Sequence, residues 1–536
     1  MMGAMTDSTR RRGPALLAVA TLLALTACTS PDSSPTPTPD SGFDIQTNSF
    51  SFPNYGNEEG YENLDAQAMR ELFGDQVCAR IDEGGRCVLS ATAGTYMEGI
   101  NDAMDDGHCF GMAGLSWALF DQEEDPQQFG GPDAADLTID DNPDLQRELA
   151  KIWATQATPP TKTAATTLTG QALLDQLERA WGQGQGFIFG IFRMKGGEQT
   201  GGHAVTPYAI RDQDDGTKAI AIYDNNYPQQ ENLILVDPVT GEWSYRAQTK
   251  PGERAELYEG GPNNPIELTP VDLTLRQQQC PFCPGASDAD DDSESDDPTF
   301  GSAPAVSMVS VNQRAHHRGV ALSVTDKKGR PIPGQETFRP TNFINATVPA
   351  VEIVPADEPF LVVIDGSDLR RPANTDVTIV RPGYSFSAGN IDMQPGSVDD
   401  IWFDPVGNEV SYGTDLGASP DLFLTFEDPD ASYEFRFGGL RLPRRGGDVD
   451  VALDQEAETV RFASPSSRRA TLDFRVKRIG RTQTDVATSD PIPVRPNEAI
   501  VIPYGRWRDS GKPLRVGIDV DGDGTIDEPL IRRDSR

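Results

Sequence analysis

The chain is poor in positive charge and, after its first 27 residues, has no long apolar run. Its 536 residues carry 83 Asp and Glu against 46 Lys and Arg, which gives a formal net charge of −37. Such an acidic chain repels the phosphates of nucleic acid and anionic lipid, so we expect neither as a partner. A membrane-spanning helix needs about 20 consecutive apolar residues, and no segment reaches that length. The chain is long enough for several cores, since one domain usually takes about 100–200 residues.

The first 27 residues are typical of an export signal. Three arginines, Arg10 to Arg12, precede an apolar run from Ala15 to Ala27 that is too short to span a bilayer. The run ends in Leu25-Thr26-Ala27-Cys28, which resembles the acylation site of a bacterial lipoprotein. The resemblance implies that acyl chains on Cys28 hold the mature chain on the outer side of the cytoplasmic membrane, in the bacterial cell envelope. Plain secretion is the alternative.

Two polar stretches divide the rest of the chain. Residues 28–42 are rich in Pro, Ser and Thr and predict a stiff, extended tether. Within residues 285–304, positions 288–297 hold seven acidic side chains, which repel one another and favour an unstructured linker. The predicted domains are therefore 43–284, 305–415 and 416–536.

In the first of these domains, predicted helices come before predicted strands. Residues 63–73 predict a helix that ends at Gly74, Pro143 opens a second helix, and Thr169 caps a third. The strands predicted after them are Phe187–Met194, His203–Ile210, Ala219–Asp224 and Leu233–Val236. This order favours an α+β fold.

After residue 304 the helical period disappears. Tyr433 to Phe437 and Leu472 to Val476 alternate apolar with charged side chains, which indicates half-buried strands. About 230 residues of this kind predict two β-sandwiches that divide near residue 415. One elaborate all-β domain is the alternative, and no internal repeat is evident in the sequence.

Cysteine is scarce, and one of the six has no evident structural role. In an exported protein, cysteines close in sequence are natural disulfide partners. A redox role for Cys280 and Cys283 is less favoured, because these two residues precede a linker. The predicted pairs are Cys78 with Cys87 and Cys280 with Cys283. Cys28 belongs to the leader, so Cys109 remains as a free thiol.

Cys109 stands at the start of a predicted buried helix. Residues 110–120 are nearly all apolar, and Gly111 and Gly114 would let another backbone approach closely. At a helix start the dipole and the free N–H groups favour a thiolate, and the same N–H groups can form part of an oxyanion hole. The position predicts a nucleophile, although a small buried cysteine is the plainer alternative.

A thiolate nucleophile needs a base, and the chain has four histidines. His316 and His317 lie in the strand-rich region, and His108 points away from its neighbour at a helix start. His203 opens a predicted strand and is the candidate. The plainer alternative is a hydrogen-bonded core histidine.

A third group must orient the histidine ring. Asp224 ends the strand after that of His203, and antiparallel pairing would bring the two side chains together. Asn225 and Asn226 are the alternative third members, and Asp224 could instead be a turn former.

This order of residues resembles the papain-like superfamily of cysteine peptidases, and its bacteriocin-processing branch most closely. The resemblance covers residues 60–280 and implies that Cys109 attacks an acyl group, His203 moves the proton and Asp224 orients the ring. The family's oxyanion glutamine is expected a few residues before the cysteine, where this chain has Ala103, and Asn101 is the nearest amide.

The sequence therefore predicts a cell-surface lipoprotein with a cysteine hydrolase domain of peptidase or amidase type. Its substrate would be protein or peptide-like material of the envelope, and its chemistry would proceed through a thioester without a cofactor. One alternative is a binding or adhesion lipoprotein with an inert papain-like domain, and another is a transferase with the same thioester chemistry. A zinc site that includes His108 and Cys109 is disfavoured, because adjacent residues rarely face one tetrahedral ion.

An acidic loop near the end has the spacing of a calcium site. Acids stand at its relative positions 1, 3, 5 and 9 with glycine at 6, but position 12 is Leu530 and a strand precedes the loop, so a full EF-hand is excluded. The candidate ligands are Asp519, Asp521, Asp523, Thr525 and Asp527. The loop resembles the freestanding calcium loops of exported bacterial proteins, which implies a structural Ca²⁺. An acidic hairpin without an ion is the alternative.

Overall fold

The computed structural model describes most of the chain after residue 38. The residues described are 39–57, 60–196, 198–248, 252, 254–283, 305–313, 320–338, 351–443, 447–464, 470–505, 507, 514–521 and 524–531. Cys28, His316, His317, Asp523 and the acidic stretch 285–304 lie outside them. In the described part, no helix has the length and apolar character to cross a membrane.

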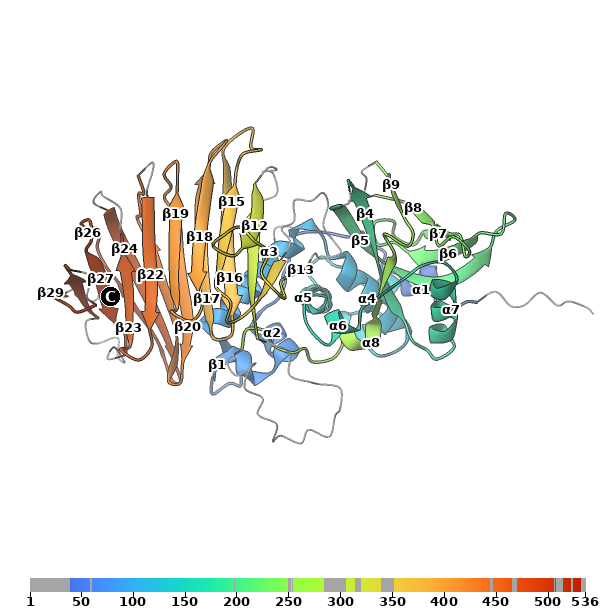
Figure 1. The fold of residues 1–536 in the computed structure, drawn as a ribbon. Helices are drawn as coiled ribbons and strands as arrows, with labels where there is room; N and C mark the ends of the chain where they lie inside the picture. The colour runs from blue at the N-terminus through green and yellow to red at the C-terminus, as the bar shows by residue number, and fades with distance from the viewer. Residues whose placement is uncertain are drawn as a thin grey trace, which may run out of the picture. The chain divides into compact units, whose positions relative to one another are not determined.

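The first region of the fold is largely helical (Figure 1). Its helices are α1 (Ile45–Asn48), α2 (Ala66–Phe73), α3 (Ala91–Ala103), α4 (Cys109–Phe120), α5 (Pro143–Thr155), α6 (Thr161–Ala164), α7 (Gly170–Trp181) and α8 (Val271–Thr274). Asp65 caps α2 by accepting a hydrogen bond from the Ala68 N–H, and Gly74 ends it with φ +83°. Pro143 opens α5, as predicted. Helix α3 was not predicted.

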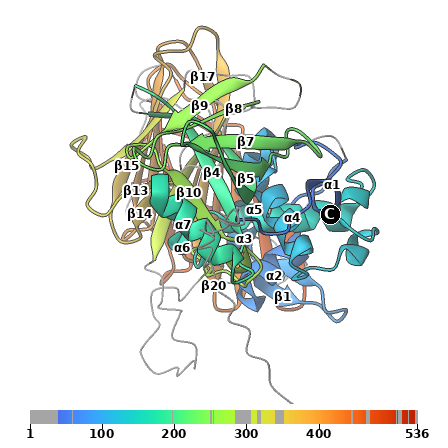
Figure 2. The same ribbon diagram turned by 90° about the vertical axis from the view of Figure 1, so that its right-hand side faces the viewer.

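An eight-stranded antiparallel sheet lies among these helices, in the order β3-β10-β4-β5-β6-β7-β8-β9. Its strands are β3 (Thr166–Leu168), β4 (Phe187–Lys195), β5 (Glu198–Asp212), β6 (Lys218–Tyr223), β7 (Glu231–Val236), β8 (Trp243–Ala247), β9 (Glu256–Gly260) and β10 (Ile266–Pro270). Along β4, Ile188 packs with the α4 core, whereas Phe187 and Phe189 pack with α7. Figure 2 accordingly shows α4 and α7 on opposite sides of β4 and β5. The four strands predicted here correspond to β4, β5, β6 and β7, but β5 begins before His203, which was expected to open it, and Asp224 lies just past the end of β6.

Helix α4 lies at the centre of this region. Every residue from Cys109 to Leu119 is buried, as its apolar sequence predicts. A Cβ at Gly111 would lie only 2.1 Å from the Leu149 carbonyl oxygen of α5. A Cβ at Gly114 would lie 2.8 Å from Ile152 Cγ2. The glycines therefore allow the close approach of α5 that the sequence predicted.

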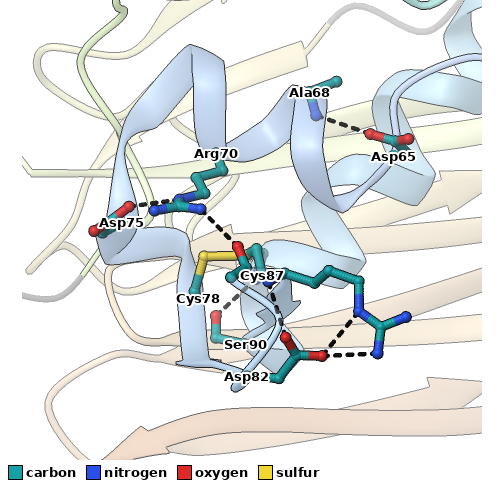
Figure 3. Close-up of a disulfide and its surroundings, with 11 residues drawn as sticks. Asp65, Ala68, Arg70, Asp75, Cys78, Asp82, Cys87 and Ser90 are labelled. Atoms are coloured by element: carbon teal, nitrogen blue, oxygen red, sulfur yellow. Dashed lines mark hydrogen bonds and ion pairs between the residues drawn. A yellow bond between two sulfur atoms is a disulfide. The ribbon is translucent and has the colours of Figure 1, made fainter.

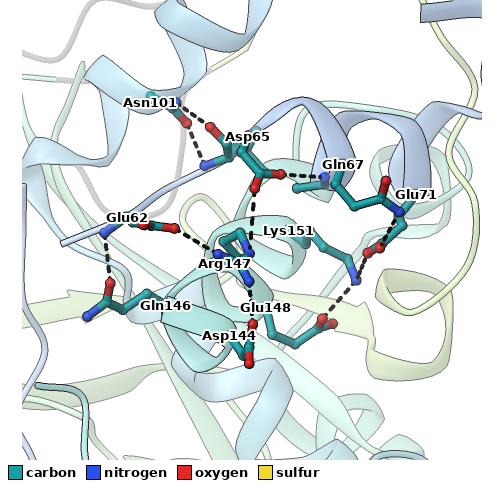
Figure 4. Close-up of polar contacts among 12 residues, drawn as sticks. Glu62, Asp65, Gln67, Glu71, Asn101, Asp144, Gln146, Arg147, Glu148 and Lys151 are labelled. Carbon is teal, nitrogen blue, oxygen red and sulfur yellow. Dashed lines mark hydrogen bonds and ion pairs between the residues drawn. The ribbon is translucent and has the colours of Figure 1, made fainter. Parts of the chain in front are cut away.

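Ion pairs on the surface of α5 join it to α2 and to the segment that leads into α2 (Figure 4). Arg147 Nη1 lies 2.7 Å from Glu62 Oε2, and Lys151 Nζ lies 2.8 Å from Glu71 Oε2. Each pair is partly exposed, so its contribution to stability is about 0–1 kcal/mol. Their effect is mainly to fix the position of α2 against α5.

The two predicted disulfides are confirmed. Cys78 and Cys87 join β1 (Cys78–Ile81) to β2 (Cys87–Leu89), and Figure 3 shows the bond beside Arg70, which contacts Asp75. The second bond joins Cys280 and Cys283. Cys109 is the free cysteine among the residues described, and it is buried.

The region after residue 304 consists of two antiparallel sheets that enclose one hydrophobic core. The first has the order β13-β14-β11-β16-β17-β20-β21-β24-β25, with β26 also paired to β24. Its strands are β11 (Val306–Gln313), β13 (Glu336–Phe338), β14 (Val351–Pro355), β16 (Ala373–Arg381), β17 (Tyr384–Met393), β20 (Asp421–Asp428), β21 (Ala431–Gly438), β24 (Ala470–Gly480), β25 (Thr484–Thr488) and β26 (Ile492–Val494).

The second sheet has the order β12-β15-β18-β19-β22-β23-β27-β28-β29. Its strands are β12 (Ala321–Thr325), β15 (Phe360–Asp365), β18 (Val398–Asp404), β19 (Glu409–Thr414), β22 (Gly447–Asp454), β23 (Thr459–Ala463), β27 (Ala499–Pro503), β28 (Arg515–Asp519) and β29 (Glu528–Ile531). In Figure 1 the two sheets form facing layers.

Both sheets continue past residue 415. In one sheet β17 pairs with β20, and in the other β19 pairs with β22, so each sheet has its own connection across the predicted boundary. Core residues from Val309 to Val516 form one cluster. The boundary predicted near residue 415 therefore matches no break in either sheet, and the alternative of one elaborate all-β unit describes these strands better.

The strands follow a repeated path that the sequence did not reveal. Hairpins alternate between the sheets, so residues 373–414, 421–463 and 470–519 each give one hairpin to each sheet. Asn408 and Glu458 occupy matching turns with positive φ, and their carbonyls accept hydrogen bonds from Leu453 N and Tyr504 N, both 3.0 Å away. The backbone path repeats, although the side chains do not.

The contact between α4 and α5 gives a stability prediction. Gly111→Ala should lower the melting temperature, because overpacking against a backbone typically costs about 1–3 kcal/mol. The matched control is Gly99→Ala in α3, where nothing lies within 4 Å of the added Cβ. That change should be neutral or stabilising by up to about 1 kcal/mol, because alanine favours helix. Equal effects of the two substitutions would contradict this account.

Candidate active site

The three residues predicted as a catalytic group come from three different elements. Cys109 is the first residue of α4, His203 lies in β5, and Asp224 directly follows β6. Strands β5 and β6 pair with Thr206 opposite Tyr223. Asp224 is therefore placed at the end of the strand next to that of His203, as the sequence predicted.

The structure brings His203 and Asp224 into direct contact. His203 Nε2 lies 2.7 Å from Asp224 Oδ1, and both side chains are buried. Asp224 Oδ2 accepts a hydrogen bond of 2.6 Å from the Tyr245 hydroxyl, and Asp224 Oδ1 also accepts one of 2.8 Å from Asn226 N. Both oxygens of this buried carboxylate are thus occupied, which is what a buried charge requires.

The thiol of Cys109 lies near enough to the same ring to affect its charge. Burial disfavours the charged imidazole, but Asp224 and Cys109 outweigh burial and raise the pKa of His203 to about 10. The ring is therefore protonated at neutral pH, beside the buried carboxyl group of Asp224.

The neighbouring residues Asn225 and Asn226 make different hydrogen bonds. Asn225 Nδ2 donates to the Cys109 and Ala204 carbonyls, at 3.1 and 3.0 Å, and so ties the start of α4 to β5. Asn226 Nδ2 donates to the Gln248 carbonyl at 2.7 Å and lies 3.4 Å from His203 Nε2. Asp224 makes the shorter contact with the ring, so the geometry favours it as the third member.

Asn101, the candidate oxyanion residue, lies elsewhere. Asn101 donates to the Leu64 carbonyl and accepts from Leu64 N, at 2.9 and 3.0 Å, which occupies both ends of its amide (Figure 4). The expectation that Asn101 serves an oxyanion gains no support from these contacts. The first N–H groups of α4 remain as donors, because a helix start leaves them without intrahelical acceptors.

His108 has a structural environment. Its ring stacks on Tyr55 at 4.3 Å, and its nitrogens lie 2.9 Å from the Tyr55 carbonyl and from Asn63 Oδ1. Burial lowers the pKa of His108 to about 4, so the ring is neutral near pH 7. These contacts turn His108 toward residues 55–63, and they do not favour a zinc site shared with Cys109.

The segment before residue 58 covers the start of α4. Asn54 N donates to the Asn225 carbonyl at 2.8 Å, and Asn54 Oδ1 accepts from His108 N at 2.8 Å. Cys109 is 1% exposed and His203 is 2% exposed. The Cys109 sulfur is therefore closed to solvent in this structure.

Sequence reasoning missed Tyr245 and the segment before residue 58 that covers the start of α4. Tyr245 lies in β8, 21 residues from Asp224, in a strand that had not been predicted. No protein-family model, curated protein or solved structure matches the chain. The papain-like interpretation accordingly rests only on the order and geometry of Cys109, His203 and Asp224.

The acidic loop follows β28. Oxygens of Asp519, Asp521 and Asp527 lie within 4.8 Å of one another, whereas Asp523 is outside the described residues. Asp519 is buried, accepts a hydrogen bond from Gly524 N at 2.9 Å and lies 3.7 Å from Arg461 Nε. Thr525 belongs to the same turn. Calcium binding by this loop stays a prediction.

The raised pKa of His203 predicts a pH window for stability. The folded value of about 10 exceeds the ordinary 6.5, so His203 stabilises the fold fully below pH 6.5 and loses this effect as the pH rises through 10. The difference in melting temperature between wild type and His203→Gln should therefore shrink between pH 7 and 10. A difference that stays constant over this range would refute the charged His203–Asp224 pair.

The calcium loop can be tested by thermal melting. Millimolar Ca²⁺ should raise the melting temperature of the wild type, because an ion that binds only the folded state stabilises it. Asp521→Ala should abolish the shift, whereas Asp357→Ala, an exposed carboxylate elsewhere, should keep it. No shift in the wild type would leave an acidic hairpin without an ion.

Proposed function

We propose that this protein is a cysteine hydrolase of papain-like fold, of peptidase or amidase type, held at the bacterial cell envelope through lipid on Cys28. The observation that carries the proposal is the buried His203 ring, which contacts Asp224 at 2.7 Å and whose pKa is raised by Asp224 and by Cys109. A thiol, an imidazole and a carboxylate in this order are the parts that acyl transfer through a thioester requires.

In the first half of the proposed reaction, the Cys109 thiolate attacks the carbonyl carbon of an amide. The charge that develops on the oxygen would be held by N–H groups at the start of α4. His203 then gives its proton to the leaving nitrogen, the carbon–nitrogen bond breaks, and a thioester remains on Cys109.

In the second half, the neutral His203 takes a proton from water, and the hydroxide attacks the thioester. The carbon–sulfur bond breaks, the acid product leaves, and the Cys109 thiolate and protonated His203 are restored. Asp224 stabilises the charged ring throughout. Tyr245 and the N–H of Asn226 act as positioning groups, because they hold the carboxylate at 2.6 and 2.8 Å.

The burial of the thiol favours a second candidate function. With Cys109 1% exposed, a domain that keeps this cover closed would have no turnover and would serve as an inert part of a binding lipoprotein. The two candidates differ in whether Cys109 reacts with reagents from solution and whether His203 controls the rate.

Thiol alkylation separates the two candidates. Iodoacetamide should label Cys109 rapidly near pH 7, and His203→Ala should slow the labelling by about ten- to a hundredfold, because the thiolate loses its charged partner. Cys109→Ser should give no label, since the other four described cysteines are in disulfides.

Tyr245→Phe is the graded control for this experiment. It removes one hydrogen bond to Asp224 and keeps the ring, so labelling should fall between the wild-type and His203→Ala rates. Slow labelling with equal rates in the wild type and His203→Ala would instead support the inert binding lipoprotein.

A further inference from the structure

A second cavity lies apart from the three residues of the candidate active site. It has a volume of about 360 Å³ and is lined by residues of α6, β3, β4, β5, β10 and β13. Cys109, His203 and Asp224 are not among its lining residues. Cavities of about 300–1,000 Å³ are the usual size for small-molecule sites.

Several polar side chains of the wall are already used inside the protein. Thr161 Oγ1 donates to the Leu273 carbonyl at 3.0 Å, and Thr337 Oγ1 donates to Glu352 Oε2 at 3.0 Å. Asn264 Nδ2 donates to the Phe192 carbonyl at 2.8 Å. These groups shape the wall, and the charged residues that line it are Lys162 and Glu267.

Glu267 is an acid without a partner. It stands on β10 between Thr167 of β3 and Gly190 of β4, and glycine has no side chain to cover it. Among the described residues, no hydrogen bond or ion pair satisfies its carboxylate. Burial alone raises its pKa, which is the mark of a charge that the protein does not compensate.

Lys162 supplies the opposite charge. Its Nζ lies 3.6 Å from Glu336 Oε2, which is largely exposed, and 5.5 Å from the centre of the Phe338 ring. Burial lowers its pKa in spite of Glu336. No ion pair joins Lys162 to Glu267 within the described part of the chain, so the cavity holds an acid and a base that do not neutralise each other.

The remaining wall is apolar. Phe192 and Met194 of β4 and Phe338 of β13 line the same space. Met194 is 36% exposed, although large apolar side chains usually prefer burial. An apolar surface beside two separated charges of opposite sign matches a molecule with both charges at one end and a hydrocarbon body.

We propose that this cavity binds a small zwitterion with an apolar body, of which a free α-amino acid is the simplest class. Its ammonium group binds the Glu267 carboxylate, and its carboxylate binds the Lys162 ammonium group. The hydrocarbon side chain packs on Phe192 and Phe338. This site is independent of the proposed hydrolase activity, since it shares no residue with the Cys109 centre.

The first experiment compares three probes on the full wild-type chain by titration calorimetry. L-Leucine carries both charges, N-acetyl-L-leucine lacks the ammonium, and L-leucine methyl ester lacks the carboxylate. Leucine should bind, and each blocked form should bind at least about tenfold more weakly, because one charge of the cavity stays unpaired. Failure of leucine to bind, or equal binding of all three probes, would overturn the proposal.

The second experiment uses Glu267→Gln and Lys162→Met. Glu267→Gln should weaken leucine about tenfold and leave N-acetyl-leucine unchanged, whereas Lys162→Met should weaken leucine and leave the methyl ester unchanged. Wild-type affinity for leucine in both variants would overturn the assignment of the two charges. The melting temperature of each variant checks that it folds, and Cys109 labelling should be unaffected in both.

Discussion

The buried carboxylate of Asp224 is the constraint on which the candidate site depends. An ionised group with no exposure is tolerated only when its oxygens are paired. His203, Tyr245 and the N–H of Asn226 supply those pairings. They come from β5, β8 and the turn after β6, so the charge of one residue fixes the relative positions of three pieces of chain. The same carboxylate keeps the His203 ring charged beside Cys109.

The position of Cys109 depends on packing as well. Helix α4 is buried on all sides, and α5 approaches its backbone at Gly111 so closely that no Cβ would fit. The start of α4 is then tied to β5 through Asn225. Cys109 is thus fixed at the start of a buried helix, whereas the segment over that start is irregular and is joined to His108 and Asn225 by hydrogen bonds.

The strands after residue 304 are arranged by a repeated backbone path. Hairpins alternate between two sheets, and each new hairpin pairs with the previous one of its own sheet. This path buries a continuous core without a repeated sequence, because the pattern requires only alternate apolar side chains and a turn at matching places. It also explains why no boundary falls near residue 415. The cavity that contains Lys162 and Glu267 is lined by β13 of this region together with β10 and α6.

Much of the fold could be predicted from short stretches of the sequence. The sequence by itself determined the buried character of α4, the glycines that let another backbone approach it, the two disulfides and four of the eight strands of the first sheet. It also singled out Cys109, His203 and Asp224, since few cysteines and histidines leave few choices. Each of these inferences needs only period, spacing or composition within a short stretch.

Only the tertiary structure decided the rest. The contact of Tyr245 with Asp224, the cover over Cys109, the use of Asn101 by Leu64 and the shared core of the β strands each join residues far apart or in unrelated patterns. Glu267 and Lys162 likewise line one cavity, although they belong to separate elements. A sequence carries no local trace of such pairings, because burial and charge compensation arise only when the elements pack.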